Sequence, residues 1–376
     1  MSSVCLVLAL ICEENSSLPG AEVSIEVPEF KQPFHVPYSL EQGLPEDGVR
    51  QVAVTAEGGL IALDDRGQVY YLDEEEWKRL ENSARSKYLF DKVPAFPTLS
   101  AQINGEYTVR DVAIQGDEIA VATSAGLYLG DGEIWHLALP QQGNTRWAPV
   151  DVRAVTYDNE GQLWFAAPQG VGCRQASNEW LLFTGSDGLP FNDFTCIAAG
   201  PDGVWFGTTN GAIQYENGNW HFRQGGRWLL DNHVLDIAVD ANGSAWIATS
   251  KGISCIAQKT MTLAEKADFY EAEIEKYHRR TEYGYVNPAL LSEPGDRSTA
   301  KATYSDNDGF NTGLYLAAVS FGYKATNDPE LLEYAHRAFA SRLFKRGNPG
   351  GTVWCSERFY CTKYHSHYRS GSQPAF

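Results

Sequence analysis

The hydrophobic positions between residues 34 and 258 fall into short runs that recur along the chain. Each repeat opens with an apolar run, passes through a turn that contains Gly or Asp, and continues into a second apolar run. The first runs begin at Val49, Val109, Val152, Phe194 and Val234. The second runs are residues 60–63, 119–122, 163–166, 204–207 and 245–248. Apolar runs of this length between turn residues predict β-strands that are buried on both faces.

Glycine and tryptophan repeat with the same period. In each repeat a glycine follows the first strand residue by 17 or 18 positions, and in four repeats a tryptophan follows that glycine by 9 or 10 positions. The glycines are Gly67, Gly126, Gly170, Gly211 and Gly252, and the tryptophans are Trp77, Trp135, Trp180 and Trp220. A four-stranded blade can bury both of its faces only between two neighbours. The pattern therefore predicts a mainly β fold, with a five-bladed β-propeller over residues 34–258.

The fifth repeat lacks a tryptophan near Met261, which indicates that its outer strand is missing. Residues 34–45 align without a gap on residues 179–190, the outer strand of the third blade and the turn after it. We therefore expect the N-terminal segment to complete the fifth blade and close the ring. Successive repeats are spaced by 60, 43, 42 and 40 residues. The excess, residues 81–106, is either a loop or a sixth blade that has lost its pattern.

The periodicity becomes helical after Thr260. Thr262 and Glu265 have the spacing of a capping box, which predicts a linker helix over residues 262–281. Its expected packed face is Leu263, Ala267, Tyr270, Ile274 and Tyr277.

An αα-hairpin is expected over residues 305–344. The packed face of its first helix is predicted to be Leu314, Ala317, Ala318 and Phe321. Its second helix should begin at Asp328-Pro329, an N-cap followed by proline at the first helical position. Residues 345–376 show neither period and are expected to form an irregular tail.

Charge and hydropathy exclude some partners. The formal net charge of −18 disfavours nucleic acid and anionic membrane surfaces. No apolar run approaches the length of a membrane span. The apolar stretch from Val4 to Cys12 makes residues 1–20 a signal peptide or a disordered tail, so a secreted, extracellular protein is expected and a cytoplasmic one is the alternative.

Cys173 and Cys255 occupy one place in two repeats and should be buried thiols in separate blades.

The best-preserved repeat resembles a known family. Residues 188–211, from Gly-Leu-Pro to Val-Trp-Phe-Gly-Thr-Thr-Asn-Gly, are similar to the two-component regulator propeller repeat, and residues 243–252 are nearly as close. The first blade departs from it, with Leu60-Ile61 where Leu-Trp is usual. The resemblance covers about 60% of the chain. It implies an extracytoplasmic sensing or ligand-binding module, frequently for glycans, and supplies no catalytic residue.

Residues 305–344 resemble a helical hairpin of an (α/α) toroid domain. Glycoside hydrolases and polysaccharide lyases built on that fold need about a dozen helices, so this resemblance implies the start of an incomplete helical domain. Asp306 and Asp308 are the candidate catalytic residues, because paired carboxylates serve as general acid and base on sugars. The same two residues also suit a helix cap or a Ca²⁺ site.

No metal or cofactor is predicted from the remaining motifs. Cys355, Cys361, His365 and His367 do not have the spacing of a zinc site. We expect a binding module for a small ligand, a carbohydrate or a protein. The alternative is a truncated carbohydrate-active enzyme whose helical catalytic domain is incomplete, and we favour binding over catalysis for this chain.

Overall fold

The computed structural model describes residues 28–81, 96–103, 106–279, 284–293 and 297–342. These residues separate into two compact units, of which the first is residues 31–260 and the second combines the residues after Thr260 with those before Lys31. The expected signal segment and C-terminal tail, with Cys355, Cys361, His365 and His367, lie outside the described residues.

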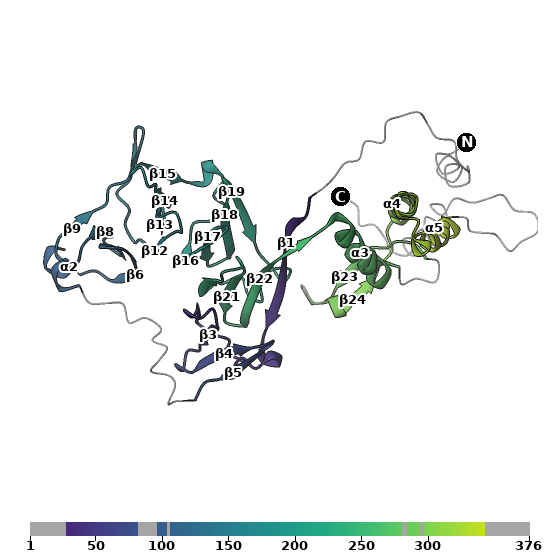
Figure 1. The fold of residues 1–376 in the computed structure, drawn as a ribbon, viewed down its shortest axis with the longest axis horizontal. Helices are drawn as coiled ribbons and strands as arrows, with labels where there is room; N and C mark the ends of the chain where they lie inside the picture. Colours follow the sequence, from purple (N-terminus) through teal and green to yellow (C-terminus); the bar gives the residue numbers. More distant parts are fainter. Residues whose placement is uncertain (1–27, 82–95, 104–105, 280–283, 294–296, 343–376) are drawn as a thin grey trace, which may run out of the picture. The chain divides into compact units, whose positions relative to one another are not determined.

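The first unit is built from four-stranded antiparallel sheets that follow one another along the chain (Figure 1). The first sheet contains β2 (Gln51–Val54), β3 (Leu60–Leu63), β4 (Val69–Asp73) and β5 (Glu76–Arg79). The second contains β6 (Val109–Gln115), β7 (Glu118–Thr123), β8 (Gly126–Gly130) and β9 (Trp135–Leu137). The third contains β12 (Ala154–Tyr157), β13 (Leu163–Ala167), β14 (Gly170–Arg174) and β15 (Trp180–Phe183). The fourth contains β16 (Phe194–Gly200), β17 (Gly203–Thr208), β18 (Gly211–Glu216) and β19 (Asn219–Arg223).

The fifth sheet takes its outer strand from the other end of the sequence. Its order is β1 (Phe30–Tyr38), β22 (Gly252–Met261), β21 (Ala245–Thr249) and β20 (Asp236–Val239). Figure 1 shows β1 running beside β22. The Lys31 ammonium group also reaches Asp202 in the turn between β16 and β17, at 2.8 and 2.6 Å from its two carboxylate oxygens. The N-terminal strand is therefore part of the sheet that the last repeat would otherwise leave incomplete.

The turn after β1 has the same geometry as the turn after β15. In both, a 3₁₀ turn (Leu40–Gln42 or Gly185–Asp187) is closed by a reciprocal capping box and ends at a left-handed glycine. These glycines, Gly43 and Gly188, have φ values of +90° and +85°. The leucine that follows each glycine is buried. The match between residues 34–45 and 179–190 thus reflects one local structure used twice.

Neighbouring blades are joined by backbone hydrogen bonds at one repeat position. The first valine of a blade donates its N–H to the carbonyl of a buried threonine in the preceding blade. The pairs are Val152 to Thr123 (3.0 Å), Val234 to Thr208 (3.0 Å) and Val49 to Thr249 (3.3 Å). The last pair joins the fifth blade to the first, with the geometry used between consecutive blades.

An aspartate two residues after the start of the blade also forms a hydrogen bond to the next blade. Asp111 of the second blade accepts the N–H of Val155 of the third at 2.9 Å. Asp236 of the fifth blade accepts the N–H of Val52 of the first at 3.0 Å. Val52 and Val155 occupy equivalent positions in the repeat. The fifth blade therefore bonds to the first blade in the same way as the second blade bonds to the third.

Aromatic side chains fill the space between the first and fifth blades. Tyr38 of β1 lies 6.3 Å from Trp77 of β5 and 5.5 Å from Trp246 of β21, measured between ring centroids. Leu44 and Val49 are buried in the same cluster. Because these rings come from both blades and from β1, the N-terminal strand contributes to the core as well as to the sheet.

The described part of the extra segment between the first two blades is helical. Helix α2 (Pro97–Gln102) packs on the second blade, where Thr98 accepts the indole N–H of Trp135 at 3.0 Å. Leu99 of this helix is fully buried. These residues therefore cover the second blade and add no strand to any sheet.

The described residues of the second unit form three main helices. They are α3 (Leu263–Glu273), which runs on into a π-turn (Ile274–His278), α4 (Asp308–Thr326) and α5 (Pro329–Arg342). A short β-ribbon of β23 (Ala289–Leu291) and β24 (Ala300–Ala302) precedes α4. The capping box of Thr262 and Glu265 is present. Asp328 accepts the N–H of Glu330 at 2.9 Å, so α5 begins as the sequence predicts.

The packed faces of α4 and α3 differ from the prediction. The side of α4 that packs on α5 carries Tyr315, Leu316 and Val319, whereas Leu314 is 56% exposed and Phe321 69%. Helix α4 has apolar residues on two sides. The spacing of these residues therefore predicts a helix but does not show which side is buried.

The expected apolar face of α3 is open over its first part, whereas Ile274 packs on the core formed with α4 and α5. Leu263 is 52% exposed and Tyr270 48%. The side of α3 that meets α4 carries glutamates, which an apolar pattern does not detect. Among the described residues no further helix covers the open sides of α3 and α4.

Replacing Gly43 by alanine is expected to destabilise the β unit by at least about 2 kcal/mol. The backbone there is left-handed, and an added Cβ would lie 2.1 Å from the carbonyl oxygen of Trp77. Gly58 is the matched control, because its φ is +82° but no atom lies within 4 Å of an added Cβ. Gly58→Ala should cost about 1 kcal/mol. Urea unfolding midpoints measure both, and equal losses would contradict the close approach at Gly43.

The N-terminal strand should make stability depend on pH. Burial lowers the pKa of His35 to about 4, and its Nε2 atom has no hydrogen-bond partner among the described residues. The unfolded chain, with an ordinary histidine pKa near 6.5, binds more protons between these two values, so stability should fall as the pH drops through that window. Thermal unfolding from pH 7 to 4.5 should therefore show a smaller decline for His35→Leu than for the wild type. The exposed His136 provides the control, and an equal decline for His35→Leu and the wild type would refute the assignment.

Candidate functional site

Connections between blades gather at one face of the β unit. In each sheet the first strand begins opposite the end of the second, as in the pairs Val109–Thr123 and Phe194–Thr208. The turn from second to third strand and the loop into the next blade therefore lie at the same end. The valine-to-threonine hydrogen bonds join these ends across blades, and we call the resulting surface the top face.

A group of polar and aromatic side chains lies on the top face of the fourth blade. It comes from the end of β19, from the turn before β18 and from the loop that leads to the fifth blade. We call it the blade-four patch, and its members are Asn210, Arg223, Gln224, Arg227, Trp228 and Asn232.

Side-chain amides form one half of the blade-four patch. Gln224 donates its Nε2 to Oδ1 of Asn210 at 2.9 Å. Asn232 reaches the same oxygen at 3.5 Å and accepts the N–H of Gly225 at 2.7 Å. Because Gln224 is exposed, this half offers hydrogen-bonding groups to solvent that are already oriented by one another.

Two arginines and one indole form the other half. The guanidinium carbon of Arg223 lies 4.7 Å from the ring centroid of Trp228, and that of Arg227 lies 5.2 Å from it. Burial lowers the pKa of Arg223, and the positive charge of Arg227 lowers it further. Two cations thus share one aromatic ring.

Several other cations of the top face have carboxylate partners, although Arg50 forms no ion pair among the described residues. Asp151 accepts Arg110 at 2.7 Å and Arg153 at 2.8 Å. Arg66 pairs with Asp47 at 2.7 Å. In the part of the chain that the structure describes, no ion pair is formed by Arg223 or Arg227. The blade-four patch is therefore a local excess of positive charge on a chain whose net charge is −18.

The structure separates the two aspartates that the sequence singles out. Asp308 is the first residue of α4 and is 1% exposed. Its Oδ2 accepts Asn287 Nδ2 at 2.6 Å and the N–H of Ser305 at 3.1 Å. Burial raises the pKa of Asp308. Asp306 is exposed, and its negative charge adds to the raised pKa of Asp308, so the two carboxylates interact although only Asp306 is open to solvent.

This arrangement stabilises the start of a helix. A buried carboxylate at the first helical position satisfies the backbone N–H of Ser305 and favours the positive end of α4. A catalytic role for Asp306 and Asp308 remains a prediction. Within the described ranges, no group of three or more His, Cys, Asp or Glu side chains could hold a metal ion.

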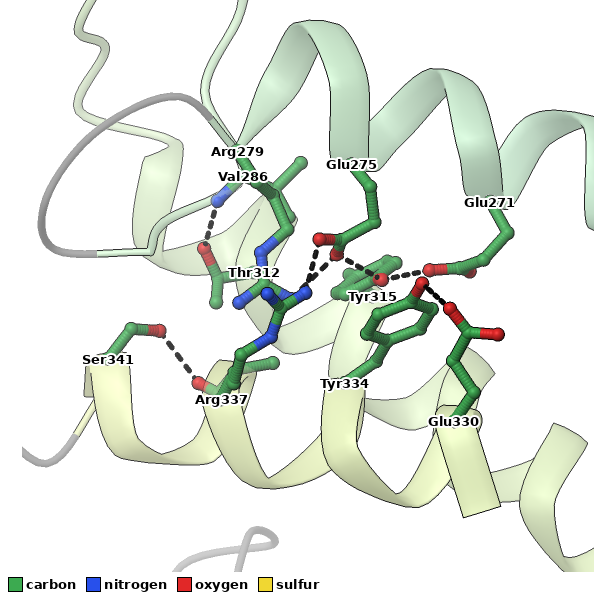
Figure 2. A network of polar contacts seen from close by, with 11 residues as sticks. Glu271, Glu275, Arg279, Val286, Thr312, Tyr315, Glu330, Tyr334, Arg337 and Ser341 are labelled. Carbon is green, nitrogen blue, oxygen red and sulfur yellow. Dashed lines mark hydrogen bonds and ion pairs between the residues drawn. The ribbon is translucent and has the colours of Figure 1, made fainter. Parts of the chain in front are cut away.

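A carboxylate network that the sequence patterns do not reveal lies between the helices of the second unit. Figure 2 shows the Tyr315 hydroxyl between Glu271 and Glu275 of α3 and its π-turn. Glu275 lies 2.9 Å from that hydroxyl and also accepts Arg337 of α5. Arg279 lies 3.1 Å from Glu275 as an ion pair. Pairs of this kind have no sequence period, since their members come from three different elements.

One phenol hydrogen serves two carboxylates in this network. Tyr315 can donate to only one of them at a time. Burial and the charge of Glu275 raise the pKa of Glu271, although its hydrogen bond with Tyr315 opposes the shift. Arg337 and Arg279 neutralise Glu275, so Glu271 is the carboxyl group that most readily takes a proton.

The thiols behave as expected. Cys173 and Cys255 are buried and free, and each lies opposite the tryptophan of the neighbouring strand in its own blade. Burial raises the pKa of each to about 12. Neither is a nucleophile at neutral pH.

The repeated four-stranded sheets and their turn chemistry define a propeller-repeat protein. Residues 188–210 match the family model of the two component regulator propeller. These residues run from the turn before β16 through β17, so this blade carries a two-component regulator propeller repeat. A search of curated proteins gave no match to the chain.

Several solved structures are similar to the chain at low identity. The extracellular domain of a putative hybrid two component system from B. thetaiotaomicron is 18% identical, with 62% of this chain and 37% of that chain covered and a TM-score of 0.36. A streptogramin B lyase is 15% identical, with 62% and 98% covered and a TM-score of 0.39. PorZ, a surface component of the type-IX secretion system of Porphyromonas gingivalis, is 16% identical, with 60% and 34% covered and a TM-score of 0.33. The present chain thus spans little more than a third of the first of these.

No helix of the described residues is long and apolar enough to cross a membrane. The comparisons do not test the start of a toroid, a secreted location or glycan recognition, which stay predictions.

The two glutamates beside Tyr315 should respond oppositely to neutralisation. Glu271→Gln keeps an acceptor for the phenol but removes a partly buried charge, so the second unit should become more stable at pH 7.5. The raised pKa of Glu271 gives the wild type extra stability below the ordinary glutamate pKa, and this is lost as the pH rises. The advantage of Glu271→Gln should therefore shrink toward pH 4.

Glu275→Gln is the matched variant. It leaves Arg279 and Arg337 without their carboxylate and should destabilise the unit by on the order of 1–3 kcal/mol at pH 7.5. Thermal unfolding followed by circular dichroism at both pH values measures the two effects. If both variants are less stable than the wild type at pH 7.5, the Glu271 carboxylate is charged and well paired, and the prediction is wrong.

Proposed function

We propose that this chain is an extracellular ligand-binding module whose propeller presents its recognition surface at the top face. The observation that carries the proposal is the blade-four patch, where amide and guanidinium groups surround an indole on loops held by a rigid repeat framework. Loops positioned in this way are the usual location of binding residues. The two-component regulator propeller repeat supports a sensing role, and the extracellular location is part of the proposal.

The proposed framework is a closed ring of five blades. The hydrogen bonds from Val49 to Thr249 and from Val52 to Asp236 support closure between the last and first blades, because equivalent bonds join consecutive blades. The outer strand β1 adds aromatic packing at the same junction. A closed ring would fix the top-face loops relative to one another and would lower the entropic penalty of binding.

We propose carbohydrate as the ligand class. Sugars present hydroxyl groups for amide side chains and apolar ring faces for aromatic ones, and the blade-four patch offers both in one place. A protein-protein interface would instead need a larger apolar centre. Among the described residues, the exposed large hydrophobic side chains do not include a neighbour of Asn210, Gln224 or Asn232 on this loop.

A glycan array probed with the full chain tests this function. Binding to a defined set of glycans is expected. Calorimetry with the best glycan should then show about a 5-fold loss for Gln224→Ala, the equivalent of one hydrogen bond. Asn219→Ala is the control, because Asn219 begins the strand β19 at the end away from the top face. Loss with Asn219→Ala and not with Gln224→Ala would place binding on the opposite face, and an array without hits would reject glycan recognition.

A further inference from the structure

The blade-four patch contains more positive charge than its surroundings balance. Arg223 and Arg227 lie on one indole ring, so their guanidinium carbons are at most about 10 Å apart. No carboxylate of the described residues forms an ion pair with either group, although the charge of Glu216 partly opposes the lowering of the Arg223 pKa. The Nε atom of Arg223 is buried and has no hydrogen-bond partner among the described residues. An anion placed against the exposed guanidinium group of Arg227 and beside that of Arg223 would relieve their repulsion.

The loop that carries Trp228 is fixed before any ligand arrives. Gly225 has a φ of +73° and its carbonyl accepts the N–H groups of Trp228 and Leu229 at 2.9 Å each. Leu229 is buried and anchors the loop in the core between the fourth and fifth blades. Leu230 donates its N–H to Ser254 Oγ at 2.8 Å. Because both ends of the loop are held, the indole and the two guanidinium groups need little ordering on binding.

The chemistry of the ligand follows from the groups that are present. A guanidinium group matches the paired oxygens of a carboxylate or sulfate. An indole accepts the apolar face of a sugar ring, and the amides of Gln224 and Asn232 serve its hydroxyls. The net charge of −18 opposes long polyanions. A short acidic sugar satisfies all of these conditions.

We propose that the blade-four patch binds an acidic oligosaccharide, with Arg223 and Arg227 holding a carboxylate or sulfate group of the sugar and Trp228 contacting its ring. This inference rests on the proposed function and specifies its ligand class. Arg227 is exposed and contributes charge without contributing to the core. Arg227→Ala therefore tests recognition without endangering the fold.

The experiment is calorimetry on the full chain at low salt with four probes. They are a uronic-acid oligosaccharide, a sulfated oligosaccharide, the neutral oligosaccharide of the same linkage, and inorganic sulfate. The better acidic sugar should bind at least 10-fold more tightly than the neutral one. Arg227→Ala should remove most of that difference and leave the neutral sugar unchanged, and Arg227→Lys should restore only part of it.

Arg50→Ala is the control, because Arg50 is an exposed arginine of the same face that has no ring or carboxylate partner among the described residues. It should bind as the wild type does. Whether the uronate or the sulfated sugar binds better identifies the source of the anion. Inorganic sulfate should bind far more weakly than either, and equal binding would overturn the sugar assignment.

The outcomes also separate this inference from the proposed function. Equal affinity for acidic and neutral sugars, with Gln224→Ala still harmful, overturns the anionic ligand and leaves the binding module intact. An acidic preference that survives in Arg227→Ala and is lost in Arg50→Ala places the anion site elsewhere and overturns the assignment to the blade-four patch. Absence of binding to every sugar overturns both proposals.

Discussion

The carboxylate of Asp236 accepts the backbone N–H of Val52 at 3.0 Å, although the two residues are 184 positions apart. This bond joins the last blade to the first, and the bond from Val49 to Thr249 lies beside it. A single blade exposes two apolar faces, so every blade needs a neighbour on each side. Much of the burial of Trp77 and Trp246 follows from this one junction, because both indoles lie in the core that the first and fifth blades share with β1.

The β unit could be anticipated from sequence because its determinants are local and repeated. A glycine with φ near +85° and a following buried leucine give the same turn after β1 and after β15, so two distant segments could be matched by eye. The missing tryptophan of the fifth repeat then indicated which sheet β1 completes. Repetition supplied five observations of each rule, which a single sequence otherwise cannot offer.

The helices show where a single pattern is insufficient. Helix α4 has apolar residues on two sides, and only the position of α5 selects Tyr315, Leu316 and Val319 over Leu314 and Phe321. Helix α3 meets its neighbour through Glu271 and Glu275, which pattern reading assigns to solvent. The sequence singles out Asp308 as a candidate catalytic residue, and that role stays a prediction; its burial and its bond to Asn287, 21 positions earlier, have no sequence pattern that would reveal them.

The blade-four patch escaped sequence reasoning for a related reason. Repeat analysis finds what the strands of the blades share, whereas Arg227 and Trp228 belong to a connecting loop. An Arg-Trp pair recurs at Arg146 and Trp147 in the loop before the third blade, where Trp147 packs on Phe165. The shared threonines and aspartates hold the blades together, and this leaves the connecting loops free to differ. Arg223 ends β19 and Arg227 lies on the loop, and the contacts of both with the Trp228 ring offset part of the repulsion between them. The proposal that this charge serves binding therefore concerns a loop that the repeat leaves free to vary, at the face where the other connecting loops also lie.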